Sequence, residues 1–310
     1  MLGFAAGIVY VAPRIHPPAA KMQSSAQPSS VSGLTPAWWQ WPTVLSLDAP
    51  AVAIGWQWLF GRISGAAIGW HHHVILGSAV WLAYAADRWI EGWLVQPDKI
   101  RTKRHAFYQR RRWPVMIAWM LVLTTATGTA WRWLLPSEFD AGLIVLGPVL
   151  LYLLSHQLAH RNHPWRVPKE ICVALLFTAG TSCFILAQDE SLLMPLLIPL
   201  LLFAGLCLTN CALISVWESE VDREHGQTSL ALQLPGRARL IRTLPWLLAA
   251  LSTCHWLTTS AVILSAIPAS ALMLGLVDLF HRRSGREISR VLADVALLTP
   301  LPLWLLSALS

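Results

Sequence analysis

Long apolar runs, separated by clusters of charge and by proline and glycine, fill the chain from about residue 42 onward. A helix needs about 20 mostly apolar residues to cross the roughly 30 Å hydrocarbon layer of a bilayer. Nine stretches approach this length: Ser46–Ile63, His73–Val95, Pro114–Leu134, Gly142–His156, Val167–Leu186, Leu192–Trp217, Leu240–Trp256, Ser260–His281 and Val291–Ala308. The pattern predicts an all-α, polytopic membrane protein in which residues 42–310 form one domain of nine transmembrane helices.

The composition agrees with this interpretation. Of the 310 residues, 55% are hydrophobic and only 13% are charged, whereas a soluble globular chain carries about a quarter charged residues. Residues 1–41 include a stretch rich in Pro, Ser and Ala and no basic start, so we expect a flexible N-terminal tail rather than a cleaved signal peptide. The five cysteines lie in or beside the apolar runs without a CxxC pair, which is typical of small core residues.

Lysine and arginine are distributed unevenly over the predicted loops. If the tail is cytoplasmic, 21 of the 23 Lys and Arg residues fall on the cytoplasmic side, and only Arg62 and Arg132 fall outside. Basic residues are retained on that side during insertion. The distribution therefore predicts an integral protein of the cell (inner) membrane with a cytoplasmic N-terminus. It also accounts for the net charge of +7 by contact with membrane lipids rather than with nucleic acid, and it implies no protein partner.

Two pairs of carboxylates stand at the cytoplasmic ends of predicted helices two and six. Asp87 and Glu91 are four residues apart, and Glu218 and Asp222 repeat the spacing. Residues four apart lie on one helical face, and acidic groups at a membrane boundary are costly unless they bind a partner or face a polar cavity. We therefore expect the four acids to line one cavity.

Paired carboxylates suit Mg²⁺, which prefers oxygen ligands and bridges carboxylates to substrate phosphates. Basic residues that follow the two pairs are candidate phosphate ligands; they are Arg88, Arg101, Lys103, Arg104 and Arg223. A single acid pair at a helix end is more commonly a solvated cap or a salt-bridge partner. Two pairs at equal depth, each followed by arginine, favour a diphosphate site.

At these residues the chain resembles the UbiA superfamily of intramembrane prenyltransferases, over about residues 42–308. Members carry an N-D-x-x-D-x-x-x-D motif after the second of nine helices and a D-x-x-x-D-x-x-x-G-x-x-S-like motif after the sixth. Asp87 and Glu91 are similar to the last two acids of the first motif. The second motif is matched by Glu218, Asp222, Gly226 and Ser229, and further similar segments are Arg101-Thr-Lys-Arg104, Ser46-Leu-Asp48-Ala-Pro50 and Val167-Pro-Lys169-Glu170.

The resemblance implies Mg²⁺-dependent transfer of a prenyl group from a polyprenyl diphosphate to an aromatic or other lipophilic acceptor within the membrane. It implies that the catalytic, metal-binding residues are Asp87, Glu91, Glu218 and Asp222, and that Tyr84 joins the basic residues in binding substrate. Mg²⁺ would neutralise the leaving diphosphate, and apolar helix walls would shield the allylic cation from water. For Trp217 and other aromatic residues near the mouth, anchoring at the membrane interface is the favoured interpretation over contact with that cation.

The chain also departs from the motifs. The Asn and leading Asp of the first motif align with Ala83 and Tyr84, glutamates replace two aspartates, and Ser46 replaces an arginine. Two alternatives therefore stay open. One is a catalytically silent UbiA-like lipid-binding or scaffold protein. The less favoured one is a small transporter, for which charges near the midplane would be expected.

Other polar clusters have simpler interpretations. The three histidines His71–His73 lie on the predicted outer side, and we interpret them as a wet, titratable loop because adjacent helical residues do not all face one ion. Arg110–Arg112 predicts contact with anionic lipid headgroups. Asp278 and Asp294 are expected to pair with Arg282 or Arg290, outside the site.

Overall fold

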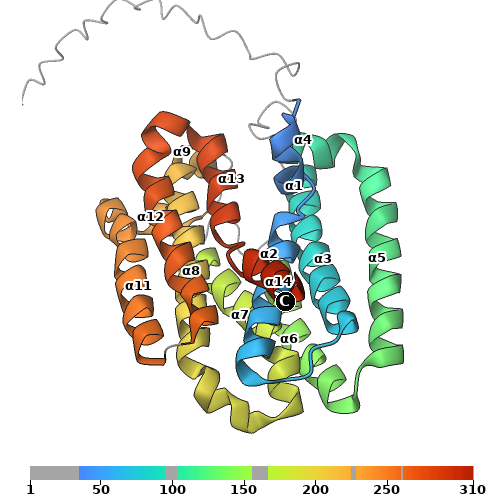
Figure 1. Cartoon of the computed structure of the whole chain (residues 1–310). Coiled ribbons are helices and arrows are strands. Elements are labelled where there is room, and N and C mark those ends of the chain that lie inside the picture. Colours follow the sequence, from blue (N-terminus) through green and yellow to red (C-terminus); the bar gives the residue numbers. More distant parts are fainter. Residues whose placement is uncertain (1–34, 95–102, 156–166, 225–227, 260, 310) are drawn as a thin grey trace, which may run out of the picture. The chain divides into compact units, whose positions relative to one another are not determined.

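The computed structural model describes residues 35–94, 103–155, 167–224, 228–259 and 261–309, except for the side chains of 91–94, 105, 308 and 309. Within these ranges the chain is helical and contains no strand. The helices are α1 (Trp41–Val44), α2 (Asp48–Ser64), α3 (Trp70–Leu94), α4 (Lys103–Arg110), α5 (Arg112–Trp133), α6 (Pro136–Leu154), α7 (Lys169–Gln188), α8 (Leu193–Trp217), α9 (Ser219–Glu224), α10 (Leu230–Gln233), α11 (Ala238–Thr259), α12 (Ala266–Ser284), α13 (Arg286–Ala296) and α14 (Pro300–Leu309) (Figure 1). Three short 3-10 helices, η2 (Trp38–Gln40), η5 (Glu190–Leu192) and η6 (Val262–Ser265), complete the described elements.

The sequence-based segments correspond to the long helices, with one exception. The first eight fall on α2, α3, α5, α6, α7, α8, α11 and α12. The ninth is divided into α13 and α14, which meet at a 42° bend. Pro300 begins α14, and the residue before a proline is biased away from helical geometry, so the chain breaks at 297–299.

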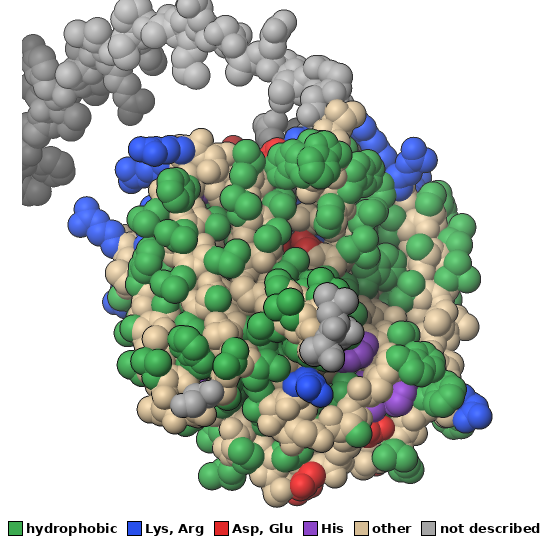
Figure 2. Space-filling model, viewed as in Figure 1, with side chains coloured by type: hydrophobic (Ala, Val, Ile, Leu, Met, Phe, Trp, Pro, Cys, Tyr) green, Lys and Arg blue, Asp and Glu red, His purple; other side chains and the backbone are tan. Residues whose placement is uncertain are grey.

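Five helices of the described residues are long and apolar enough to cross a membrane, or six if α13 and α14 together make one span. The predicted total of nine spans stays a prediction. The outward faces are apolar; in α5 and α6, for example, Leu121 and Ile144 are 64% and 74% exposed. Figure 2 shows such side chains over much of the visible flank. Exposed apolar surface of this extent is typical of lipid contact, and the molecule is an integral membrane protein by this criterion.

Helix α2 lies at the centre of the packing. It contacts α3, α7, α13 and α14, and its Trp56 is fully buried and stacks on Phe203 of α8 with ring centroids 4.5 Å apart. The indole Nε1–H of Trp56 donates to the carbonyl oxygen of Leu297 (2.8 Å). That carbonyl lies at the break after α13, where no helical N–H is placed to bind it. The bond therefore ties α2 to the broken ninth segment.

Most of the basic residues that the structure describes gather at one end of the bundle. Figure 1 shows α4, α9 and the start of α13 at this end, and Figure 2 shows most visible Lys and Arg side chains there. Arg62 and Arg132 lie instead in the last turns of α2 and α5. We call the end with α4, α9 and the start of α13 the basic end, and the end with Arg62 and Arg132 the opposite end. Which end faces the cytoplasm stays a prediction.

The helical unit begins earlier than residue 42. Residues from Pro36 onward cluster with it, and Gln40 is buried and donates through Nε2 to the Glu287 carboxylate of α13 (2.8 Å). Gln40 lies within residues 1–41, which are expected to form the flexible tail. Its long-range partner is what fixes it.

Candidate functional site at the basic end

Glu218 lies at the centre of the basic end, directly after α8. Only 8% of the residue is exposed. Its Oε2 accepts a hydrogen bond from Arg290 of α13 and contacts Nη2 of Arg104 of α4 at 3.5 Å. Burial acts to raise the pKa of Glu218, but the charges of Arg290 and Arg104 outweigh it and hold the pKa well below its ordinary value. The carboxylate is therefore charged and occupied by guanidinium groups.

A second cluster adjoins the first. Lys103 Nζ lies 3.0 Å from the Glu287 carboxylate and donates to Oε1 of Gln40 (3.1 Å). Together the two clusters surround a small cavity of about 60 Å³ whose lining includes the cations Lys103, Arg104, Arg286 and Arg290 and the acids Glu218 and Glu287. Four cations against two carboxylates leave an excess of positive charge, which suits an anionic ligand.

Asp222 lies one turn beyond Glu218, in α9, and is also buried, at 7% exposure. Its backbone N–H donates to the Glu218 carbonyl (2.9 Å), so the predicted spacing of four residues is a helical turn here. Asp222 lies close enough to Glu170 of α7 for the two carboxyl groups to interact electrostatically. Arg223, which follows it, is exposed.

The first acid pair lies on α3. Asp87 and Tyr84 are half-buried; Glu91 lies in α3, but its side chain is outside the described residues, as are Arg101 and Gly226. Arg88 corrects an expectation: it is buried, and its Nη1 donates to the Thr43 carbonyl and to Ser46 Oγ, both at 2.5 Å. Arg88 fastens α3 to the turn before α2 and does not line the small cavity.

That turn is built around an unusual residue. Ser46 has a φ of 60°, a left-handed conformation that is uncommon outside glycine. Its hydroxyl is hydrogen-bonded to the phenol of Tyr108 in α4 (2.8 Å) as well as to Arg88. These contacts hold α4, with Lys103 and Arg104, against α1.

Several residues of the basic end were not found by sequence reasoning. Arg290, Gln40 and Glu287 take part in the two clusters. Asp48 of α2 and Asp294 of α13 lie near each other and near the phenol of Tyr84. Asp294 is one of the two aspartates expected outside the site. The sequence indicates these residues only indirectly, because the predicted helices on this side begin and end with charged residues.

Two further expectations are corrected. Trp217 is buried rather than an interfacial anchor; its Nε1–H donates to Asp278 Oδ1 (2.9 Å), and its ring stacks on His281. Asp278 therefore pairs with Trp217 and, at 3.9 Å, with Arg242, not with Arg282 or Arg290. An aspartate at a helix end has several basic neighbours in the sequence. The packing of α8 against α12 determines which partner it contacts.

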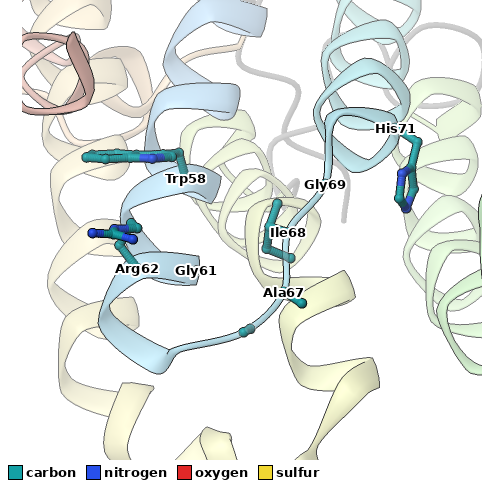
Figure 3. Close-up of a pocket in the computed structure, with 8 residues that line it drawn as sticks. Trp58, Gly61, Arg62, Ala67, Ile68, Gly69 and His71 are labelled. Atoms are coloured by element: carbon teal, nitrogen blue, oxygen red, sulfur yellow. The ribbon is translucent and has the colours of Figure 1, made fainter. Parts of the chain in front are cut away.

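The histidines at the opposite end are not a wet loop. They lie in the first turn of α3, and His72 is buried between the Gly69 N–H, which donates to Nδ1 (3.0 Å), and the Glu138 carboxylate (3.0 Å). Side-chain ligand atoms of His71, His72 and Glu138 all lie within 4.8 Å of one another. Both ring nitrogens of His72 are already hydrogen-bonded, so the cluster is a helix-tying network. Beside it is a cavity of about 430 Å³ whose lining includes His71. Figure 3 shows Trp58 and Arg62 projecting from one side of α2 and the loop leading through Gly69 to His71.

Comparison with known proteins bears on the fold. No protein-family model and no curated protein matches the sequence. Among solved structures, the chain is similar to the apo structure of a UbiA homolog from Aeropyrum pernix K1, with a TM-score of 0.57 and 12% identity over 84% of this chain and 98% of that one. The chain has a UbiA-like fold. This confirms the fold class and, at the level of architecture, the resemblance that the acidic motifs indicated. The UbiA-like helices carry the two acidic segments on α3 and at the α8–α9 junction.

Proposed function

We propose that this UbiA-like protein is an intramembrane prenyltransferase that binds a polyprenyl diphosphate at the basic end and transfers the prenyl group to a lipophilic acceptor. The observation that carries the proposal is the convergence of four cations from α4 and α13 on the cavity beside Glu218. An anionic headgroup fits this excess charge, and the apolar helices below it suit an isoprenoid tail.

The chain's own residues have distinct tasks in this proposal. Arg104, Lys103 and Arg290 would hold diphosphate oxygens, and Glu218 and Glu287 keep these cations in place before substrate arrives. The Arg88 guanidinium carbon lies over the ring of Tyr84, 5.9 Å from the ring centroid. Buried apolar side chains of α2 and α8 would keep water away from the allylic cation.

Magnesium is part of the proposal. When bound, Mg²⁺ would neutralise the charge that develops on the departing diphosphate. The donor set fits in part. Asp222 and Asp87 supply carboxylate oxygens, the donor type that Mg²⁺ prefers. Oε2 of Glu218 is bound by two guanidinium groups, so Glu218 fits better as the anchor of the arginines than as a metal ligand.

The test is diphosphate release by the purified full chain in lipid nanodiscs, with radiolabelled prenyl diphosphates of several lengths, Mg²⁺ and a membrane lipid extract as acceptor source. We expect release that depends on Mg²⁺ and falls at least tenfold in Asp222→Asn and Asp87→Asn. The matched control is Asp140→Asn, because Asp140 is exposed in α6. Equal background release by all four proteins would reject catalysis.

One observation favours a second candidate, the silent UbiA-like lipid-binding protein. The guanidinium groups on Glu218 and the replacement of two motif residues by Ala83 and Tyr84 reduce the metal ligands near the headgroup. The same nanodisc experiment separates the candidates. A silent relative would bind the labelled diphosphate, lose that binding in Arg104→Gln, and release none.

A further inference from the structure

Glu170 is a buried acid whose carboxylate is half unsatisfied. It lies in the first turn of α7 with 2% exposure. Its Oε1 accepts a hydrogen bond from the backbone N–H of Leu230 (3.0 Å). In the described structure its Oε2 is buried without any hydrogen-bond partner. Nearly all buried polar atoms have a partner, so an orphaned carboxylate oxygen needs an explanation.

A second buried carboxylate lies near Glu170. Asp222 acts on Glu170 by its negative charge, and Lys169 acts on it more strongly by its positive charge. Two buried carboxylates near one another are costly unless cations or a proton offset their charge. The local balance, two carboxylates against one ammonium group, therefore leaves room for an additional cation.

Ser229 supplies an independent observation at the same place. It is fully buried, and its hydroxyl oxygen has no hydrogen-bond partner in the described structure. Ser229 stands at the N-cap of α10, where a serine normally accepts from a backbone N–H of the first turn, yet it makes no such bond. Because Leu230 is the next residue, the bond from its N–H to Glu170 places Ser229 one residue from a direct contact with Glu170. Helix α9, with Asp222, packs against α10.

We infer that Glu170, Asp222 and Ser229 form a divalent-cation site of the Mg²⁺ class between α7, α9 and α10. Hard cations prefer oxygen ligands, and Mg²⁺ keeps several of its waters, so the two carboxylates can hold it directly or through a bound water. The remaining positions would be open to water or to diphosphate oxygens. That last assignment rests on the proposed function; cation binding itself does not.

The inference differs from the sequence-based expectation in one residue. The motif spacing assigns the metal to Glu218 and Asp222, whereas the structure gives Glu218 to Arg104 and Arg290 and leaves Glu170 with a free carboxylate oxygen. Glu170 lies 52 residues before Asp222 in the sequence. No motif spacing links the two.

The test uses Mn²⁺ as a probe for the Mg²⁺ site. The purified full chain in detergent is titrated with Mn²⁺, and the free ion is measured by electron paramagnetic resonance, with Mg²⁺ as competitor. We expect one Mn²⁺ per chain, displaced by Mg²⁺. Glu170→Gln should raise the Kd at least tenfold and Ser229→Ala several-fold, whereas Glu218→Gln should change it less than twofold.

Several outcomes would overturn the inference. They are the absence of Mn²⁺ binding to the wild type at millimolar concentration, a larger effect of Glu218→Gln than of Glu170→Gln, and equal losses in every acid variant including Asp140→Asn. Folding is controlled by thermal denaturation. Mn²⁺ should raise the Tm of the wild type but not that of Glu170→Gln, and the Tm without metal shows whether the variant is folded. None of these readouts requires prenyl transfer, so failure of the proposed function would leave the result intact.

Discussion

Glu218 is a carboxylate that stays charged below the protein surface because two arginines face it. The charge of this end of the molecule and the turn that joins Glu218 to Asp222 were predictable from local spacing. The partners Arg104 and Arg290 of Glu218 were not, because they lie 114 and 72 residues from it along the chain. Spacing within one helix orders side chains on a face, but only the packing of separate helices selects a partner.

The acid titration of Glu218 gives a prediction at this scale. Its folded-state pKa lies below the ordinary value of 4.5, so its contribution to stability is complete above about pH 5 and is lost as the pH falls below 4.5. At pH 7 we expect Glu218→Gln to be less stable than the wild type by about 2 kcal/mol. The measurement is unfolding of both proteins at pH 7, 5, 4 and 3. A stability difference that does not shrink at low pH would contradict this account.

Arg88 and Arg104 should respond differently to substitution. Arg88→Lys keeps the charge but loses the bonds to Thr43 and Ser46, so we expect a loss of about 2 kcal/mol in stability with little change in the KM of diphosphate release. Arg104→Gln should leave stability within about 1 kcal/mol and raise the KM severalfold. Thermal denaturation and release kinetics check both variants. A raised KM with unchanged stability in Arg88→Lys would restore its expected role as a phosphate ligand.

The helices themselves follow from the sequence, but their ends do not always do so. Apolar runs bounded by charge place α5, α7, α8 and α12 within a few residues, because a span must be apolar along its whole length. Pro300 accounts for the break between α13 and α14, but the donor that binds the Leu297 carbonyl at this break is Trp56, 241 residues away. Glu170 shows the same limit, because a charged first turn is ordinary in a helix. The surroundings that bury its carboxylate include α9 and α10. These helices are too short to produce a periodic pattern in the sequence, so the burial of Glu170 was not predictable.

The bond across this break can be tested with a matched pair of tryptophans. Trp56→Phe removes the only side-chain donor described for the Leu297 carbonyl, in a fully buried position. We expect a loss of about 2 kcal/mol from the unsatisfied carbonyl and the missing indole volume. Trp131→Phe is the control, since Trp131 is 81% exposed, and it should change stability by less than about 0.5 kcal/mol. Similar effects of both substitutions on thermal unfolding would show that the bond does not stabilise the break.

At the scale of the whole molecule, the separation of charge between the two ends decides how the protein lies in the membrane. The basic end carries α4, α9 and the start of α13, and it holds both the cation-rich cavity and the inferred metal site. Retention of Lys and Arg during insertion predicts an orientation with this end inside. It would also place the site where water-soluble diphosphate headgroups and Mg²⁺ are available. The concentration of basic residues at one end therefore bears both on the orientation of the protein and on the proposed binding of diphosphate.

Cysteine labelling tests this orientation. In a background with the five native cysteines replaced, Arg132→Cys lies in the last turn of α5 and Arg283→Cys in the last turn of α12, at opposite ends of the molecule. A membrane-impermeant maleimide added to intact cells should label position 132 and reach position 283 only after permeabilisation, because the predicted topology assigns 21 of the 23 basic residues to the cytoplasmic side, which is the side of position 283. The control is a permeant maleimide, which should label both. Labelling of position 283 in intact cells would show that the protein has the opposite orientation. The cation-rich cavity would then lie outside the cell, away from the supply of substrate on which the proposed transfer depends.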